Sequence, residues 1–220
     1  MPALEKVDVY RLGALASGGG TNLQAIMDQC SSGELPACMA VVISNNSDSG
    51  ALERARRSGV SACHLSGRTH PDPGALDKAI AGVFQSHGVD LVLLAGYMKK
   101  LGPVTLQSYP SRILNIHPAL LPAFGGKGMY GTRVHRAVIE SGARVSGVTV
   151  HLADEEYDRG PIVAQQAVQV DQDDTPESLA ARVLEVEHRV YSDVVRLFAE
   201  GRVRVEAGRV RILENTESKR

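Results

Sequence analysis

The chain has 220 residues, of which 43% are hydrophobic and 22% charged, and its formal net charge is −1. This length suits one large or two small domains with a real core. The near-neutral charge gives no indication of a nucleic-acid-binding surface or an anionic-membrane footprint. The longest apolar stretch, residues 91–98, is far shorter than the ~20 residues of a membrane span. We therefore expect neither a nucleic-acid nor a membrane partner.

The amino-terminal segment and the spacing of the cysteines bear on the cellular compartment. The amino-terminal segment lacks the long apolar stretch of a secretory signal. The three cysteines, Cys30, Cys38 and Cys63, contain no C-x-x-C pair, which argues against both a disulfide framework and a zinc knuckle. We expect a cytoplasmic protein with reduced thiols.

The first half of the chain alternates predicted strands with predicted helices. Apolar runs predict strands, and apolar residues at helical spacing predict helices between them. The expected strands are 7–16, 38–44, 60–65, 91–95 and 112–116, and the expected helices are 21–30, 50–57 and 74–87. This alternation is typical of an α/β fold with a Rossmann-like, doubly wound, mostly parallel sheet.

The second half has a different pattern. Residues 145–152 and 162–170 alternate apolar and polar side chains, which predicts two antiparallel strands. A long helix follows over 175–198, with Thr175 as its N-cap, and a hairpin is expected at 202–213. We expect a single domain over 1–220, in which 1–118 is the Rossmann-like nucleotide-binding half. The remainder, 119–220, extends the same sheet and completes the site.

A glycine-rich turn follows the first predicted strand. Three glycines come after Ser17, and Thr21 and Asn22 open the next helix. Glycine lets the backbone approach an anion closely, and the free amides and dipole of a helix amino terminus favour a phosphate. The turn lacks the last glycine of G-x-G-x-x-G, because Leu23 stands there, and it lacks the Gly-Lys-Ser/Thr of a nucleoside-triphosphate loop. Two interpretations stay open: a phosphate-binding loop, or only a tight strand–helix turn.

The string Asn115-Ile116-His117-Pro118 ends the strand expected at 112–116. Side chains alternate along a strand, so Asn115 and His117 point to the same side. Their place at the carboxyl edge is where open parallel sheets bind ligands. An amide donor beside an imidazole suits a reaction in which a carbonyl oxygen becomes negative. The competing interpretation is a core histidine beside a strand-end asparagine.

Asp158 lies in the turn between the two antiparallel strands. If it folds against His117, its charge would raise the pKa of the histidine and fix the tautomer of the ring. It could also accept, through a water, the proton shed by an attacking amine. The alternative is an ordinary turn aspartate followed by Arg159-Gly160-Pro161.

The histidines do not indicate a metal site. All seven are scattered, with no H-E-x-x-H and no neighbouring cysteine pair. No G-x-S-x-G elbow indicates a serine hydrolase either. We expect no bound metal.

Taken together, these motifs resemble the phosphoribosylglycinamide formyltransferases, the folate-dependent family of purine synthesis. The resemblance runs from about Leu12 to Arg202. It rests on A-S-G-G-G-T-N-L-Q-A-I (16–26), V-I-S-N-N (42–46), L-A-G-Y-M (94–98), L-N-I-H-P-A-L-L-P (114–122) and the D-x-G-P-I turn (158–162). The N-I-H-P string also resembles methionyl-tRNA formyltransferase, from which the S-G-x-G-T-N-L-Q opening differs. It resembles formyltetrahydrofolate deformylase as well, which usually carries an amino-terminal regulatory domain that we do not expect here.

The resemblance implies a role for each matching position. The residues with an implied catalytic role are Asn115, His117 and Asp158. Those with an implied role in holding the phosphate and glycinamide parts of the substrate are Gly19, Gly20, Thr21, Asn22 and Glu187. Those implied to line the folate pocket are Met98, Lys99, Lys100, Leu101, Asp154, Glu155, Glu156 and Tyr157. Without the resemblance, Glu187 would be interpreted as a solvated helix position.

Two departures from the family pattern affect these assignments. Lys99-Lys100 stands where many members have arginine, and lysine keeps the charge but loses the planar fork. After Pro122 the chain reads A-F-G-G-K-G-M-Y-G, which is longer and richer in glycine than usual. We expect 123–135 to be a mobile loop that closes over the ligands, with the contacts of Lys127 and His135 left open.

The implied reaction is formyl transfer from the co-substrate 10-formyltetrahydrofolate to the amine of glycinamide ribonucleotide, by direct attack and without a metal. Asn115 and a protonated His117 would stabilise the oxyanion, and Asp158 would keep the histidine charged. A homodimer is compatible with the sequence. The alternatives are a formyltetrahydrofolate deformylase, in which water replaces the amine, and a non-catalytic nucleotide-binding module.

Overall fold

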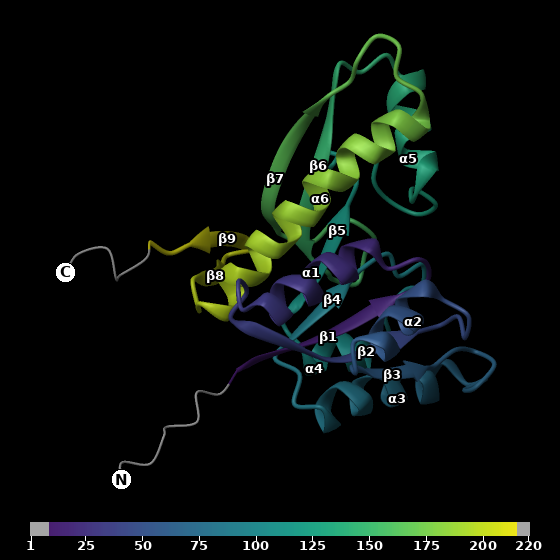
Figure 1. Ribbon diagram of the computed structural model, residues 1–220, viewed down its shortest axis with the longest axis vertical. Coiled ribbons are helices and arrows are strands. Elements are labelled where there is room, and N and C mark those ends of the chain that lie inside the picture. The colour runs from purple at the N-terminus through teal and green to yellow at the C-terminus, as the bar shows by residue number, and fades with distance from the viewer. Residues whose placement is uncertain (1–8, 215–220) are drawn as a thin grey trace.

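A computed structural model describes residues 9–214, and its centre is one seven-stranded sheet (Figure 1). The strands lie in the order β3-β2-β1-β4-β5-β6-β7. They are β1 (Tyr10–Ala16), β2 (Ala37–Ser44), β3 (Ser61–His64), β4 (Leu91–Leu94), β5 (Ile113–His117), β6 (Val145–Leu152) and β7 (Ile162–Gln169). The first five pair in parallel, whereas β6 runs antiparallel to β5 and β7 antiparallel to β6. The expected Rossmann-like fold with an antiparallel extension is confirmed.

Six helices cover the two faces of the sheet in the described part of the chain. They are α1 (Thr21–Ser32), α2 (Gly50–Arg57), α3 (Pro73–Ser86), α4 (Pro103–Ser108), α5 (Thr132–Glu140) and α6 (Pro176–Ala199). One apolar core joins α1, α2, α5 and α6 to one face, and a second core joins α3 and α4 to the other (Figure 1). Among these helices none is both long and apolar enough to cross a membrane.

Most of the expected elements are present, with some differences. The long helix starts as expected, since Thr175 accepts from the Ser178 backbone N–H and Pro176 follows it. The terminal hairpin is also confirmed, as β8 (Val203–Glu206) and β9 (Arg209–Ile212). Residues 7 and 8 of the first expected strand lie outside the described residues.

Two short helices were not expected. The first, α4, follows Gly102, and the second, α5, occupies the end of the segment 123–135 that we expected to be a mobile loop. Glycine and proline around each helix resemble loop composition, whereas burial of Val134 and Val138 against the core stabilises α5. The end of this segment is therefore helical from Thr132 onward, and its mobility stays a prediction.

The strand order places the ligand-binding edge. The chain goes from β1 outward through β2 and β3, then returns to β4 on the other side of β1. Such a reversal opens a crevice outside the carboxyl ends of the strands, where doubly wound folds bind ligands. The loops after β1, β4 and β5 all leave the sheet at this edge.

The long helix α6 is tied to this edge by Tyr191. Its side chain is fully buried, and the hydroxyl lies 3.1 Å from the Leu114 carbonyl oxygen and 3.3 Å from that of Leu94. One hydroxyl group thus joins the helix to two neighbouring strands.

Replacement of Tyr191 by phenylalanine should reduce the free energy of unfolding by about 1–2 kcal/mol, because buried carbonyls lose their donor. Urea denaturation measures the change, with Tyr130→Phe, at an exposed position, as the control. Equal stability of the two variants would contradict the role given to the hydroxyl.

Candidate active site

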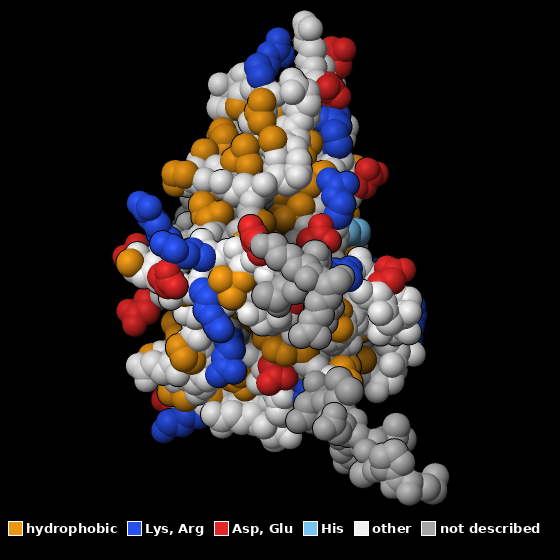
Figure 2. All heavy atoms as spheres, turned by 90° about the vertical axis from the view of Figure 1, so that its left-hand side faces the viewer, with side chains coloured by type: hydrophobic (Ala, Val, Ile, Leu, Met, Phe, Trp, Pro, Cys, Tyr) orange, Lys and Arg blue, Asp and Glu red, His pale blue; other side chains and the backbone are white. Residues whose placement is uncertain are grey.

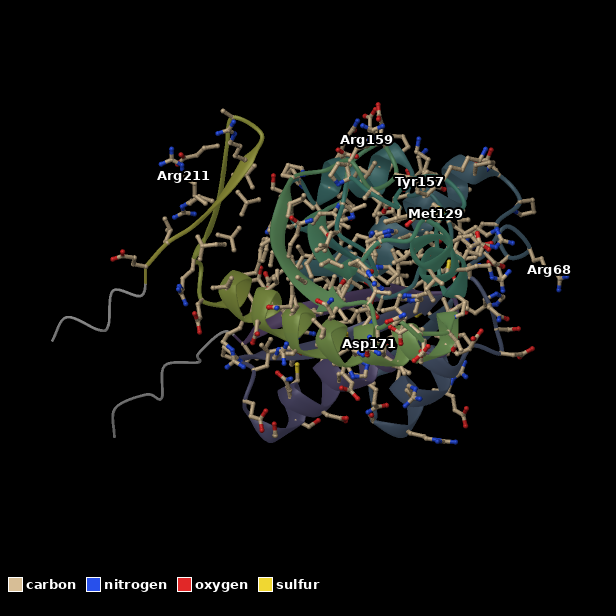
Figure 3. The ribbon with its side chains drawn as sticks, turned by 90° about the horizontal axis from the view of Figure 1, so that it is seen from above. Arg68, Met129, Tyr157, Arg159, Asp171 and Arg211 are labelled. Atoms are coloured by element: carbon tan, nitrogen blue, oxygen red, sulfur yellow. The ribbon has the colours of Figure 1, made fainter. Side chains whose placement is uncertain are left out.

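A cavity of about 640 Å³ opens at the carboxyl ends of β4 and β5. Its walls come from residues 94–101, the end of β5, the loop 126–133, the turn 153–158 and the inner side of α6. Figure 3 shows Met129 and Tyr157, which belong to two of these walls, on the same side of the molecule. Segments from both halves of the chain therefore enclose one space.

The structure brings Asn115, His117 and Asp158 together on the wall of this cavity. Asn115 and His117 lie on the same side of β5, as the strand period requires. The Asn115 Nδ2 group donates to Asp158 Oδ1 over 3.3 Å, and His117 Nδ1 lies 3.7 Å from Asp158 Oδ2. The acid is thus in contact distance of both strand residues.

His117 is nearly enclosed, with 3% of its surface exposed, although it lines the cavity. Its Nε2 lies 2.8 Å from the Phe124 carbonyl oxygen, and since a carbonyl only accepts, Nε2 carries a hydrogen. Burial lowers the pKa of His117, and this effect outweighs the opposite influence of Asp158. The charge of Asp158 raises this pKa, as expected, but the protein withdraws the ring from water and the net shift is downward.

Asp158 adopts a left-handed backbone conformation, with φ of 57°. Its Oδ2 accepts from the Gly126 N–H over 2.8 Å. Burial raises the pKa of Asp158, but the nearby His151 ring and the hydrogen bond from the Gly126 N–H outweigh it, so the net shift is downward. The acid is therefore ionised at neutral pH.

His151 is a further residue of this group, which the sequence did not single out. It pairs with Asn115 across the β5–β6 ladder. Its Nε2 lies 3.0 Å from Asn115 Nδ2 and 3.6 Å from Asp158 Oδ1, and its Nδ1 lies 2.9 Å from the Leu152 carbonyl oxygen. The register of β5 against β6 would have revealed it, but register between distant strands is not visible in the sequence.

The glycine turn lies beside the cavity rather than in its wall. Gly20 has φ of 74°, and a Cβ there would lie 2.9 Å from Ala51 Cα, so the turn needs glycine at this position. It precedes α1 without a side-chain cap, which leaves amides of the first turn for another acceptor. Of the predicted phosphate-loop residues Gly19, Gly20, Thr21 and Asn22, the cavity wall includes Asn22.

Glu187 from α6 lies in the wall of the cavity. It accepts from Asn22 Nδ2 over 3.2 Å and is only 8% exposed. Burial raises the pKa of Glu187 to about 7, although the hydrogen bond from Asn22 opposes the rise. A buried carboxyl that points at a cavity differs from the solvated position that its sequence context alone indicates.

The residues expected to line a folate pocket share this cavity. Met98, Lys99, Lys100 and Leu101 form one wall, and Asp154, Glu155, Glu156 and Tyr157 form another. Their assignment to folate stays a prediction. Within residues 9–214, no group of three or more His, Cys, Asp or Glu side chains is arranged to hold a metal ion.

Residues 10–195 match the formyl transferase family. The phosphoribosylglycinamide formyltransferase, chloroplastic, of Arabidopsis thaliana is 44% identical over 94% of this chain and 72% of its own length. The crystal structure of glycinamide ribonucleotide transformylase 1 from Symbiobacterium toebii is 50% identical, with a TM-score of 0.88 over 94% of this chain and 95% of that chain. A formyltetrahydrofolate deformylase from Pseudomonas syringae is 26% identical, with a TM-score of 0.83 over 94% of this chain and 67% of that chain.

The raised pKa of Glu187 predicts a pH-dependent stability. Since the folded protein holds this proton up to about pH 7 and the unfolded chain loses it near the ordinary value of 4.5, stability falls as pH rises from about 4.5 to 7. Glu187→Gln should remove this fall in stability. At pH 8 its free energy of unfolding should be greater than that of wild type by on the order of 3 kcal/mol. Urea unfolding at pH 4.5 and at pH 8 measures the difference in the free energy of unfolding. The control is Glu185→Gln, an exposed position on the same helix. A constant difference across this range would contradict the assignment.

Proposed function

The chain belongs to the formyl transferase family, and we propose that it transfers the formyl group of 10-formyltetrahydrofolate to the amine of N1-(5-phosphoribosyl)glycinamide in purine biosynthesis. The observation that carries this proposal is the meeting of Asn115, His117 and Asp158 in one cavity beside the amino terminus of α1. An amide, an imidazole and an ionised acid in one wall suit acyl transfer.

We assign the substrate subsites by their chemistry. The amides of Gly19 to Asn22 would hold the phosphate of the nucleotide, because a helix amino terminus favours an anion. Glu187 would face its glycinamide and ribose part. The segments 98–101 and 154–157 would line the reduced folate on the other side of the trio. Holding both substrates together supplies much of the rate acceleration.

The chemical step is a direct attack. The amine nitrogen forms a bond to the formyl carbon, whose oxygen becomes an oxyanion near Asn115 and His117. The amine proton passes towards His117 and Asp158, the bond from the formyl carbon to the folate nitrogen breaks, and that nitrogen receives a proton. Because burial lowers the pKa of His117, the ring starts neutral and gains its charge as the oxyanion develops.

Both oxyanion donors have internal partners in the described conformation. Asn115 donates to Asp158, and His117 donates to the Phe124 carbonyl oxygen. We propose that substrate binding displaces the loop around Phe124, where Gly126 has φ of 99°. The donors would then exchange their internal acceptors for the oxyanion.

A deformylase is the second candidate, favoured by the similarity to the Pseudomonas syringae structure. Incubation with 10-formyltetrahydrofolate, with and without glycinamide ribonucleotide, separates the two. A transferase consumes the folate only when the nucleotide is present. Release of formate without the nucleotide at a comparable rate would contradict transfer as the main activity.

Two further expectations stay proposals. A homodimer could form through β7, since this edge strand carries no charged residue and an uncharged open edge pairs readily. Figure 2 shows apolar side chains gathered in the upper part of one face of the molecule. Sedimentation velocity would measure the assembly.

A cytoplasmic location is the other proposal, and the name of the Arabidopsis thaliana relative places that protein in the chloroplast.

Removal of either oxyanion donor should reduce turnover by about 10²–10³-fold. We expect this loss in His117→Ala and in Asn115→Ala, with the fold retained by circular dichroism. His70→Ala is the control, because His70 lies on the loop before α3 and outside the cavity wall. Near-normal turnover in a folded His117→Ala or Asn115→Ala protein would exclude the mechanism.

A further inference from the structure

The segment 97–101 separates two cavities. The active-site cavity lies on one side, and a second cavity of about 780 Å³ lies on the side of α3. The residues that line both are Tyr97, Lys99, Lys100 and Leu101. Tyr97 and Leu101 of this segment pack in the core on the α3 side, whereas residues 98–100 between them are exposed, so the middle of the segment has few packing contacts. Its position therefore depends on what holds its two ends.

The carboxyl end of the segment is held by Asp77 of α3. Asp77 is 5% exposed, and its Oδ2 accepts from the Val104 N–H over 2.7 Å. Its Oδ1 accepts from the Thr105 N–H over 3.0 Å and from the Thr105 hydroxyl over 2.6 Å. These donors belong to the first turn of α4, whose N-cap Gly102 supplies no side-chain bond. One buried acid from another helix thus caps α4.

Gly102 makes this arrangement possible. A Cβ at this position would overlap the Asp77 carboxyl group. The end of the segment and the acid are therefore in direct contact, and a change at Asp77 is transmitted to the main chain that follows Leu101.

The amino end of the segment is held by Ser17. Its backbone N–H donates to the Gly96 carbonyl oxygen over 3.0 Å, and its hydroxyl oxygen accepts from the Met98 N–H over 2.8 Å. The hydroxyl in turn donates to Asn45 Oδ1 over 2.6 Å. With this end fixed to the turn that follows β1, Asp77 holds the other end.

We propose that Asp77 is a positioning residue for the reduced-folate side of the active site, which it shapes by capping α4 and fixing the segment 97–101. The proposal rests on the proposed function, since it takes this segment as a folate wall. Asp77 lines the second cavity and lies outside the wall of the active-site cavity. It acts through the main chain between Leu101 and Thr105.

Asp77→Asn provides the test, because asparagine has the same shape but turns one acceptor into a donor facing backbone N–H groups. We expect the Kd for 5-formyltetrahydrofolate, measured by isothermal titration calorimetry, to rise about tenfold, since a displaced wall loses contacts throughout. The KM for 10-formyltetrahydrofolate should rise in parallel. The KM for the nucleotide and the kcat at saturating folate should stay within about twofold of wild type.

Asp72→Ala is a control on the same helix, because alanine removes a helix cap. Asp72 caps α3 by accepting from the Ala75 N–H over 2.6 Å, and it lies outside both cavity walls. Its loss should lower Tm without changing the Kd for 5-formyltetrahydrofolate. A purely structural role for Asp77 predicts the same behaviour for both variants, and this result would overturn the inference.

Thr105→Val keeps the test decisive if Asp77→Asn does not fold. This variant removes one donor to Asp77 and should raise the Kd for 5-formyltetrahydrofolate about threefold, a smaller effect because both backbone hydrogen bonds remain. An unchanged Kd in folded Thr105→Val would overturn the inference as well. Wild-type protein that binds no folate would instead overturn the proposed function together with this inference.

Discussion

The carboxylate of Asp158 is the contact on which the site depends. A buried carboxylate is costly unless hydrogen bonds satisfy it, and here the donors come from separate parts of the chain. The Gly126 N–H belongs to the loop after β5 and the Asn115 amide to β5, while the His151 ring of β6 lies 3.6 Å from Oδ1. Because the two donors belong to different segments, the acid fixes the loop, β5 and its own turn relative to one another. His117 then lies between this charge and the Phe124 carbonyl oxygen.

The antiparallel direction of β6 makes this contact possible. Because β6 runs antiparallel to β5, its last residue, Leu152, pairs with Leu114 near the start of β5. The turn that follows folds back, so that Asp158 lies beside Asn115 and His117. Thr149 on β6 stabilises the preceding turn, since its hydroxyl donates to the Ala119 carbonyl oxygen over 2.7 Å and accepts from the Leu121 N–H over 3.0 Å. The chain after His117 is thereby fixed to the same strand that brings Asp158 back.

The sequence predicted the alternation of strands and helices and the shared side of Asn115 and His117, because both follow from local periodicity. It singled out Asp158 from its position in a turn, and Glu187 only through a family resemblance. It did not predict α4 and α5, whose stability comes from tertiary contacts such as the Asp77 cap rather than from local propensity. The pairing of His151 with Asn115 depends on strand register, and the direction of the His117 pKa shift depends on burial. Neither quantity is encoded in a short motif.

The charge of Asp158 favours the protonated form of His117, while burial of the ring opposes it. An NMR titration of the His117 ring in the wild-type protein and in Asp158→Asn measures this balance directly. With the carboxylate charge removed and burial unchanged, the pKa of His117 should be lower in the variant than in the wild-type protein. An equal or higher pKa in the folded variant would contradict the claim that Asp158 organises the charge of this site.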